Sequence, residues 1–196
     1  MESVPLENQT EPQIPAQEKT DWKHVLLDLL ETVGLAVVLF LIINALSARV
    51  RVDGFSMLPT LHDGEFVLVN KLAYHVGQPT RGDIIVFQST TQQNLDLIKR
   101  VIGLSGDHVV IGSGKVSVNG QTLSEPYIAA APNYSGDWNV PDGYLFVLGD
   151  NRNDSSDSHA WGFLPLQNVI GKALLIYWPP PEWAMVDHVQ IEVPGP

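Results

Sequence analysis

The sequence predicts a mainly β protein in which a folded-sheet or barrel-like domain follows a single N-terminal apolar helix. The helix is indicated by one long apolar run, residues 25 to 46, which contains only two charged side chains. Beyond it, short segments rich in β-branched and aromatic residues alternate with glycine- and proline-containing turns, a pattern typical of antiparallel sheets. No long amphipathic helical pattern follows residue 46, so we expect residues 48–196 to form one β-rich domain.

The apolar run is long enough to cross a bilayer, which takes about 20 residues. Its two acids, Asp28 and Glu31, fall in the first turns, where they can reach the headgroup region. A cleaved signal peptide and a buried core helix are the alternatives. The long acidic start disfavours a signal peptide, and the length and all-round hydrophobicity favour a membrane span. We therefore expect a retained transmembrane helix at residues 23–47, after a disordered tail at residues 1–22.

Seven segments have the length and composition of β-strands. Turn signals separate them, and Asn119-Gly120 is the strongest two-residue hairpin signal of the set. The predicted strands are residues 65–70, 83–88, 95–102, 108–111, 115–118, 144–148 and 172–177.

The composition argues against several kinds of function. The formal net charge is −11 at pH 7 and no basic stripe is present, so no nucleic-acid partner is expected. The chain has no cysteine, which excludes thiol catalysis and disulfide bonds. The six histidines are scattered without ligand spacing, and residues 150–154 lack the glycine of a calcium loop. Neither a metal nor another cofactor is expected.

Two residues have the chemistry of a nucleophile and its base. Ser56 lies in the turn sequence GFSMLP, residues 54–59, and a serine needs a proton acceptor and an oxyanion donor to attack a carbonyl. Strand alternation places Lys99 on the same face as Leu97 and Val101. Burial there would favour the neutral amine, which can act as a general base. From the local pattern alone, a surface lysine and an ordinary turn serine stay open as alternatives.

A run of short polar side chains, residues 149–158, directly follows the predicted strand at 144–148. We call this run the polar box. A hydroxyl here could position the lysine amine while aspartate and arginine side chains brace the loop. The same groups could also do no more than satisfy the loop backbone. The composition fits both interpretations.

Together these segments resemble type I signal peptidases, the membrane-anchored Ser-Lys proteases that remove signal peptides from exported proteins. The resemblance implies a signal-peptidase-like folded sheet and covers almost everything from about residue 25 to about residue 178. Four stretches carry it in the order and spacing of the family, namely residues 56–61, 81–87, 99–107 and 149–158.

The resemblance implies a role for each matching residue. Ser56 would be the nucleophile and give one oxyanion donor through its N–H, and Lys99 would be the general base, with its amine oriented by Ser155. The substrate groove would be lined by Phe55, Met57, Asp83, Ile84, Ile85 and Val86. The site would be braced by Arg100, Asp150, Arg152 and Asp157.

Two positions depart from the family pattern. Gly54 stands where some members have a serine whose hydroxyl completes the oxyanion hole. His159 stands where the family usually has arginine, and a neutral imidazole cannot make the same forked contact with Asp157. We therefore expect Asp157 to rely on Arg100, on Arg152 or on a protonated His159.

The resemblance also implies partners and a location. The substrates would be exported preproteins with Ala-x-Ala-like cleavage sites, and the lipid bilayer would hold the enzyme. It would be a single-pass protein of the cell membrane, with its N-terminus cytoplasmic and its catalytic domain on the extracytoplasmic side. Charge does not set this direction, because two basic residues flank each end of the apolar run.

Two alternative functions are weighed against this one. The first is a self-cleaving repressor- or mutagenesis-type Ser-Lys protease, which would lack the membrane segment and the polar box. The second is a noncatalytic membrane-tethered β-domain that binds secreted chains, which would have lost Ser56 or Lys99.

A further segment, residues 178–185, is too short for a second span, and its two tryptophans are expected either to touch a membrane interface or to cover the core.

Overall fold

The structure is a computed structural model that describes residues 22–92 and 94–193. Residues 1–21 of the predicted N-terminal tail lie outside the described residues. The chain divides into two compact units, the first ending at Leu41 and the second beginning at Ile42. The first unit is most of helix α1, Trp22–Leu46, which lies one residue from the predicted bounds at each end.

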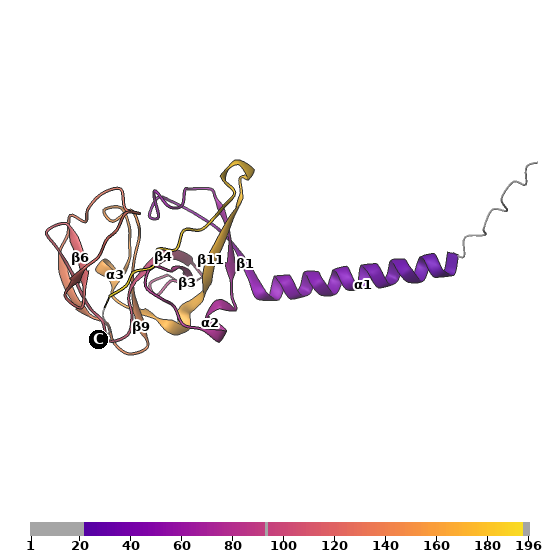
Figure 1. Ribbon diagram of the computed structural model, residues 1–196, viewed down its shortest axis with the longest axis horizontal. Coiled ribbons are helices and arrows are strands. Elements are labelled where there is room, and N and C mark those ends of the chain that lie inside the picture. Colours follow the sequence, from indigo (N-terminus) through magenta and orange to yellow (C-terminus); the bar gives the residue numbers. More distant parts are fainter. Residues whose placement is uncertain (1–21, 93, 194–196) are drawn as a thin grey trace, which may run out of the picture. The chain divides into compact units, whose positions relative to one another are not determined.

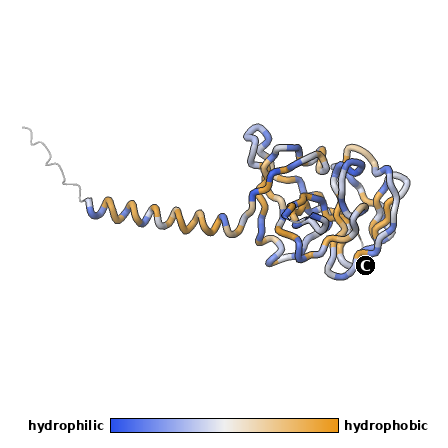
Figure 2. Tube along the Cα trace, turned by 180° about the vertical axis from the view of Figure 1, so that it is seen from behind, coloured by the Kyte–Doolittle hydropathy of each residue, from blue (hydrophilic) through white to orange (hydrophobic). Residues whose placement is uncertain are grey.

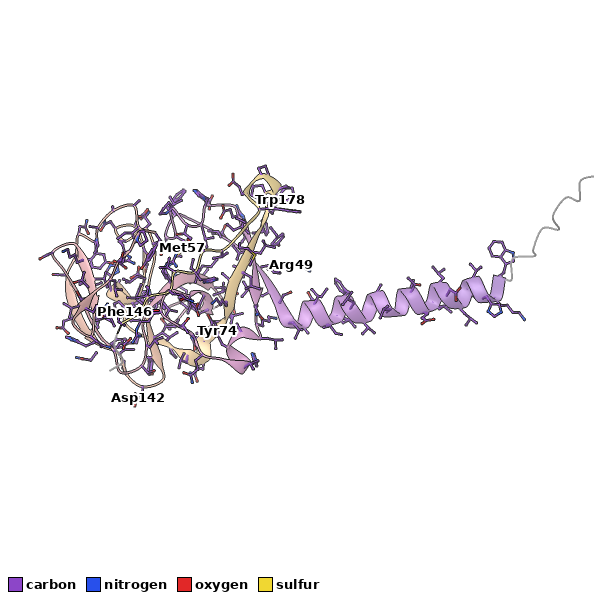
Figure 3. The ribbon with its side chains drawn as sticks, in the orientation of Figure 1. Arg49, Met57, Tyr74, Asp142, Phe146 and Trp178 are labelled. Atoms are coloured by element: carbon purple, nitrogen blue, oxygen red, sulfur yellow. The ribbon has the colours of Figure 1, made fainter. Side chains whose placement is uncertain are left out.

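Helix α1 is apolar on all sides. Figure 2 shows hydrophobic residues along almost its whole length, and none of its side chains is buried. Figure 3 likewise shows side chains projecting from it in every direction. In length and composition the helix suffices to cross a membrane.

The second unit contains a large antiparallel sheet that curls around the centre of the domain (Figure 1). Its strand order is β1-β2-β11-β3-β4-β9-β10, with β12 added beside β11. The strands are β1 (Ser47–Arg51), β2 (Phe66–Asn70), β3 (Ile84–Gln88), β4 (Asp96–Gly103), β9 (Tyr144–Leu148), β10 (Leu164–Pro165), β11 (Val169–Trp178) and β12 (Ala184–Met185).

A smaller antiparallel sheet has the order β7-β6-β5-β8. The strands are β5 (His108–Gly112), β6 (Lys115–Val118), β7 (Gln121–Thr122) and β8 (Gly136–Asn139). The predicted hairpin lies here, because Val118 pairs with Gln121 across Asn119 and Gly120. Both loop residues have positive φ, 52° and 79°, as a two-residue hairpin turn of this kind requires.

The remaining elements are short: α2 (Ala73–Val76), α3 (Ser158–Trp161), η1 (Leu166–Asn168) and η2 (Pro180–Glu182). The mainly β prediction is confirmed, and each of the seven predicted strands lies on an observed one. The prediction missed β1 and β8, and also the two-residue strands β7, β10 and β12. Strand β1 follows the helix without a turn signal, and β8 consists of Gly, Asp, Trp and Asn, which are mostly turn formers.

Strands β3 and β4 lie between two separate hydrophobic clusters. Ile84 and Val86 pack into one cluster, whereas Ile85 and Phe87 pack into another. This explains the continuous apolar sequence of β3, since both of its faces are buried. From Ile98 onward, a side chain on β4 is therefore removed from water on either face, and this placement determines the chemistry of Lys99.

Candidate active site

Lys99 and Ser56 meet in the second unit. The amine Nζ of Lys99 is hydrogen-bonded to Ser56 Oγ at 2.8 Å, and it donates a second bond to the carbonyl oxygen of Ile98 at 2.9 Å. Burial lowers the pKa of Lys99 from 10.5 to about 8, although the carboxylates of Asp157 and Asp150 act in the opposite direction. Much of the amine is therefore neutral near pH 8, and it lies within reach of the serine proton.

A compact turn presents Ser56. The Leu58 N–H donates to Phe55 O at 3.2 Å and the Leu61 N–H donates to Met57 O at 3.0 Å. The Met57 and Leu61 side chains anchor the turn in the core. Within the described part of the chain, the Ser56 N–H has no hydrogen-bond acceptor, so it is free to donate to an oxyanion.

Gly54 has a conformation that favours glycine. Its φ is +95°, and its N–H donates to Asp63 Oδ1 at 2.7 Å. A serine in this backbone conformation would be strained. A second oxyanion donor must therefore come from a group other than a side chain at position 54.

The polar box holds the nucleophile turn through several contacts. The Asn151 N–H donates to Ser56 O at 3.0 Å, and Asn151 Nδ2 donates to Phe55 O at 3.1 Å. Thr60 Oγ1 donates to Asp150 Oδ2 at 2.5 Å. A Cβ at Gly149 would collide with Ser56 O and Ser155 Oγ, so the box approaches the turn as closely as a glycine permits.

Two fully buried arginines brace the box. Arg100 makes a forked contact with Asp150, with distances of 2.8 and 2.7 Å, and its guanidinium lies over the Tyr127 ring, 4.1 Å from the centroid. Arg152 makes a similar fork with Glu125 at 3.0 and 2.7 Å. Each buried charge therefore has a partner that offsets its desolvation.

Asp157 is supported by His159. The His159 Nδ1 lies 2.6 Å from Asp157 Oδ1, and the Gly149 N–H donates to Asp157 Oδ2 at 2.9 Å. The imidazole is stacked on the Tyr134 ring, with centroids 4.0 Å apart. Of the three supports expected for Asp157, the structure shows His159, because both arginines pair with other carboxylates.

Ser155 packs against Gly149 near the Ser56 carbonyl and makes no hydrogen bond to the lysine. Its Oγ is buried and has no hydrogen-bond partner among the described residues. The hydrogen bonds of Lys99 go instead to Ser56 and Ile98. The role of Ser155 in orienting the amine thus stays a prediction, although an unpaired buried hydroxyl is available for it.

The groove beside the dyad corrects part of the sequence prediction. A cavity of about 180 Å³ is lined by two segments, the residues just before Ser56 and those just before Lys99: Arg51, Val52, Asp53, Ser56, Met57, Leu95, Asp96, Leu97, Ile98 and Lys99. Of the six residues predicted to line the groove, only Met57 lines this cavity. Phe55 lies outside it and is exposed.

The strand residues Asp83, Ile84, Ile85 and Val86 do not line the groove. Their side chains are buried, and β3 pairs with β4 on one edge and with β11 on the other. Asp83 accepts hydrogen bonds from Lys172 Nζ at 2.6 Å and Tyr74 Oη at 2.9 Å. A strand with both edges paired and both faces buried has no surface left for a substrate.

Several site residues were not predicted as such. Thr60 and Asn151 lie inside the matching stretches, so their short polar side chains were the available signal. Glu125 and Tyr127 are far from these stretches and follow no recognisable pattern. Only the folded structure reveals them as partners of Arg152.

A serine hydroxyl against a buried lysine amine, with a free N–H and an adjacent cavity, is the arrangement of a Ser-Lys hydrolase. It can perform acyl transfer without a histidine.

The comparisons with known proteins agree with this class. Residues 26–178 match the sequence profile of the family described as "Signal peptidase, peptidase S26".

Relatives match over most of their length. Signal peptidase I of Leptolyngbya laminosa is 46% identical over 180 residues, covering 87% of this chain and 89% of that protein. Probable signal peptidase I-1 of Synechocystis sp. is 46% identical over 160 residues, covering 77% and 82%. A crystal structure of a signal peptidase I from Enterococcus faecalis is 35% identical, covers 48% of this chain and 96% of that chain, and has a TM-score of 0.43. The chain therefore belongs to the signal peptidase family, peptidase S26, which confirms the resemblance found in the sequence.

Proposed function

We propose that Ser56 and Lys99 carry out the cleavage reaction of this chain, a serine endopeptidase that removes N-terminal signal peptides from exported preproteins. The observation that supports this assignment is the 2.8 Å contact between Lys99 Nζ and Ser56 Oγ. The second support is burial, which lowers the pKa of Lys99 to about 8. Membership of the family also decides against a self-cleaving repressor.

The proposed reaction has two acyl-transfer steps. Neutral Lys99 accepts the Ser56 proton as Oγ attacks the scissile carbonyl carbon, and the Ser56 N–H donates to the resulting oxyanion. The lysine ammonium then protonates the leaving amine, which departs with the mature chain. Lys99 next takes a proton from water as the water oxygen attacks the acyl-enzyme carbonyl, and it returns this proton to Ser56 Oγ as the ester bond breaks. The signal peptide leaves with a new carboxyl group, which releases its proton to solvent, and Lys99 is neutral again.

The substrate is proposed to bind as an added strand. Residues 96–99 of β4 pair with β3 on one side, whereas β9 pairs only from Arg100 onward. The other edge of this segment faces the cavity, whose second wall is residues 51–53. An extended preprotein can form backbone hydrogen bonds there, and the small cavity suits alanine at the first and third positions before the cut, as in Ala-x-Ala sites.

The membrane arrangement is part of the same proposal. Residues 23–47 form the single transmembrane helix, and residues 48–196 form the catalytic domain on the extracytoplasmic side of the cell membrane. The tail at residues 1–22 is then cytoplasmic. Trp178 and Trp183 are more than half exposed, which favours a surface role over covering the core, and Figure 3 places Trp178 near the turn that follows β11. They are proposed to contact the bilayer interface.

The test uses the full chain solubilised in detergent and a preprotein with an Ala-x-Ala site. We expect the wild-type chain to cut in trans, and we expect Ser56→Ala and Lys99→Ala each to lower kcat by at least about a thousandfold. Ser89→Ala, at a partly exposed serine in the loop between β3 and β4, is the matched control. Binding without cleavage by the wild type would favour the noncatalytic alternative, and full activity of either dyad variant would refute the assignment.

A further inference from the structure

The last described segment, residues 186–193, crosses between the two sheets, and we call it the C-terminal strap. It has no helix or strand and lies beyond residues 26–178, the part that matches the family. Val186 is buried in the hydrophobic cluster of β2 and β3, whereas Ile191 and Val193 pack on the cluster of the smaller sheet. The strap thus joins the cores of both sheets.

The strap lies directly against the chain that enters β3. Gly82 has a φ of +90°, and a Cβ there would collide with the carbonyl of Val189. Only glycine allows this close approach without strain. The contact fixes the strap beside the first residues of β3.

His188, in the strap, forms a bridge between two strands. Its Nδ1 accepts a hydrogen bond from the Ile84 N–H of β3 at 3.1 Å, and its Nε2 lies 2.8 Å from Ala173 O of β11. One protonation state satisfies both contacts, the neutral ring with hydrogen on Nε2. The regular pairing of β3 with β11 ends at Ile85 and Lys172, so the imidazole continues the connection where the backbone ladder stops.

A chain of contacts connects the strap to the turn that carries Ser56. Ile84 is the cross-strand partner of Arg100, and Arg100 Nη1 also donates to Asp187 O in the strap at 3.3 Å. Arg100 holds Asp150, and Asp150 accepts the hydroxyl of Thr60 in the Ser56 turn. Two successive strap residues therefore support the bracing arginine, Asp187 by contacting it directly and His188 by holding β3, the strand that pairs with it.

We propose that His188 is a positioning residue for the Ser56–Lys99 pair. Its neutral ring keeps the strap on β3 and β11, and the strap keeps Arg100, and through it the nucleophile turn, in the geometry that the reaction needs. The inference rests on the proposed function of the dyad. It adds a residue outside the matched family region to the machinery of the site.

The groups around His188 give the bridge a dependence on pH. The Oδ1 atom of Asp83, just before β3, lies 3.9 Å from the Nδ1 atom of His188. The same carboxylate is paired with Lys172 of β11 and accepts a hydrogen bond from Tyr74 of α2. The positive charge of Arg100 acts on the ring from β4. A protonated ring carries hydrogen on both nitrogens and cannot accept from Ile84. Burial, and after it the charge of Lys172, lowers the pKa of His188 despite the opposing Ala173 carbonyl and Asp83 carboxylate.

Protonation of His188 at low pH destabilises the folded chain, because the folded state binds this proton less tightly than the unfolded state. The unfolded chain takes up the His188 proton near the ordinary pKa of about 6.5, and the folded chain takes it up only at lower pH. The stabilisation from the bridge is therefore complete above about pH 6.5 and is lost as the pH falls below it.

The first test is kinetic and compares His188→Ala with His188→Asn, whose amide oxygen can accept from Ile84 without titrating. At about pH 9, we expect His188→Ala to lower kcat roughly tenfold with KM within about twofold, the scale of one lost buried hydrogen bond. We expect His188→Asn to recover most of this loss. The matched control is His108→Asn, at a half-exposed histidine of the smaller sheet. Wild-type kcat in His188→Ala, or no recovery in His188→Asn, would overturn the proposal.

The second test needs no turnover. Hydrogen exchange of the β3 amides is measured on the full chain in detergent at about pH 5.5 and pH 8, after correction for intrinsic exchange rates. We expect wild-type protection at Ile84 to fall severalfold, and by no more than about tenfold, at the lower pH, and we expect no such change in His188→Asn. Identical pH dependence in the two proteins would refute the bridge. Because exchange is read without substrate, failure of the bridge and failure of the proposed function give different results.

Discussion

Two lysines of one sheet have the same cross-strand partner and opposite environments. Lys99 on β4 and Lys172 on β11 both pair with Ile85 of β3. Lys172 Nζ meets the Asp83 carboxylate at 2.6 Å, whereas the hydrogen bonds of Lys99 go to a hydroxyl and a carbonyl. Burial lowers the pKa of Lys99 to about 8. Lys99 can act as a base because it is buried without a carboxylate of the described chain in direct contact, whereas Lys172 is partly exposed and ion-paired with Asp83.

The lowered pKa of Asp83 also indicates an ion pair with Lys172. Burial alone would raise the pKa of Asp83, but the hydrogen bond from Lys172, followed by those from the Thr80 N–H and Tyr74, lowers it below its ordinary value. The ionised carboxylate is thus the favoured form at neutral pH. Lys172 and Asp83 form a structural ion pair, and Lys99 has no equivalent counter-ion in contact among the described residues.

The strongest test replaces each lysine by methionine. We expect Lys99→Met to abolish cleavage, by at least about a thousandfold in kcat, and at the same time to stabilise the fold. The folded chain holds the lysine proton less tightly than the unfolded chain, since the folded pKa is about 8 against 10.5. Below about pH 8 this difference costs roughly 3 kcal/mol, which methionine removes. Unfolding in urea and peptide cleavage are the measurements.

Lys172→Met should behave in the opposite way. It leaves the buried Asp83 carboxylate without its cation, so we expect the free energy of unfolding to fall by about 2–3 kcal/mol, less than for a fully buried pair because Lys172 is partly exposed. The folded fraction should still cleave substrate. Equal loss of activity in both variants, or a destabilised Lys99→Met, would show that the comparison between the two lysines is wrong.

The pH profile tests the same comparison with no substitution. Because the active form of Lys99 is the neutral amine, log kcat/KM should rise with a slope near 1 below about pH 8 and level off above it. Cleavage of a peptide with alanine at the first and third positions before the cut, measured from about pH 6 to 10, gives the profile. A plateau that begins only near the ordinary lysine pKa would mean that burial does not act on Lys99 as the structure indicates.

Much of the fold and the dyad could be predicted because local patterns carry them. The β3 sequence is apolar on both faces, and the turn at Asn119 and Gly120 needs positive φ, which those two residue types permit. Ser56 and Lys99 stood out because they lie in matching stretches. These signals involve neighbours in sequence, so the unfolded chain already displays them.

The groove and the supports of the site could not be predicted because they depend on long-range pairing. Asp83 lies outside the cavity beside the dyad, and nothing in the sequence shows that β11 covers the second edge of β3. The fork between Arg152 and Glu125 joins the loop after β9 to the loop after β7. The bridge of His188 likewise spans more than a hundred positions to Ile84. Such partners are chosen by topology, which local composition does not encode.

The smallest predicted effect concerns His159, which acts on Lys99 through Asp157. The Asp157 carboxylate raises the pKa of Lys99 against the larger effect of burial, and His159 Nδ1 lies 2.6 Å from that carboxylate. His159→Arg places a permanent positive charge there, so it should lower the pKa of Lys99 slightly. We expect kcat/KM to rise about two- to threefold near pH 7 and to stay unchanged near pH 9. His159→Gln, which adds no charge, is the control and should leave the midpoint of the profile in place. Superimposable profiles for the wild type and His159→Arg would show that Asp157 does not transmit the charge of residue 159 to Lys99.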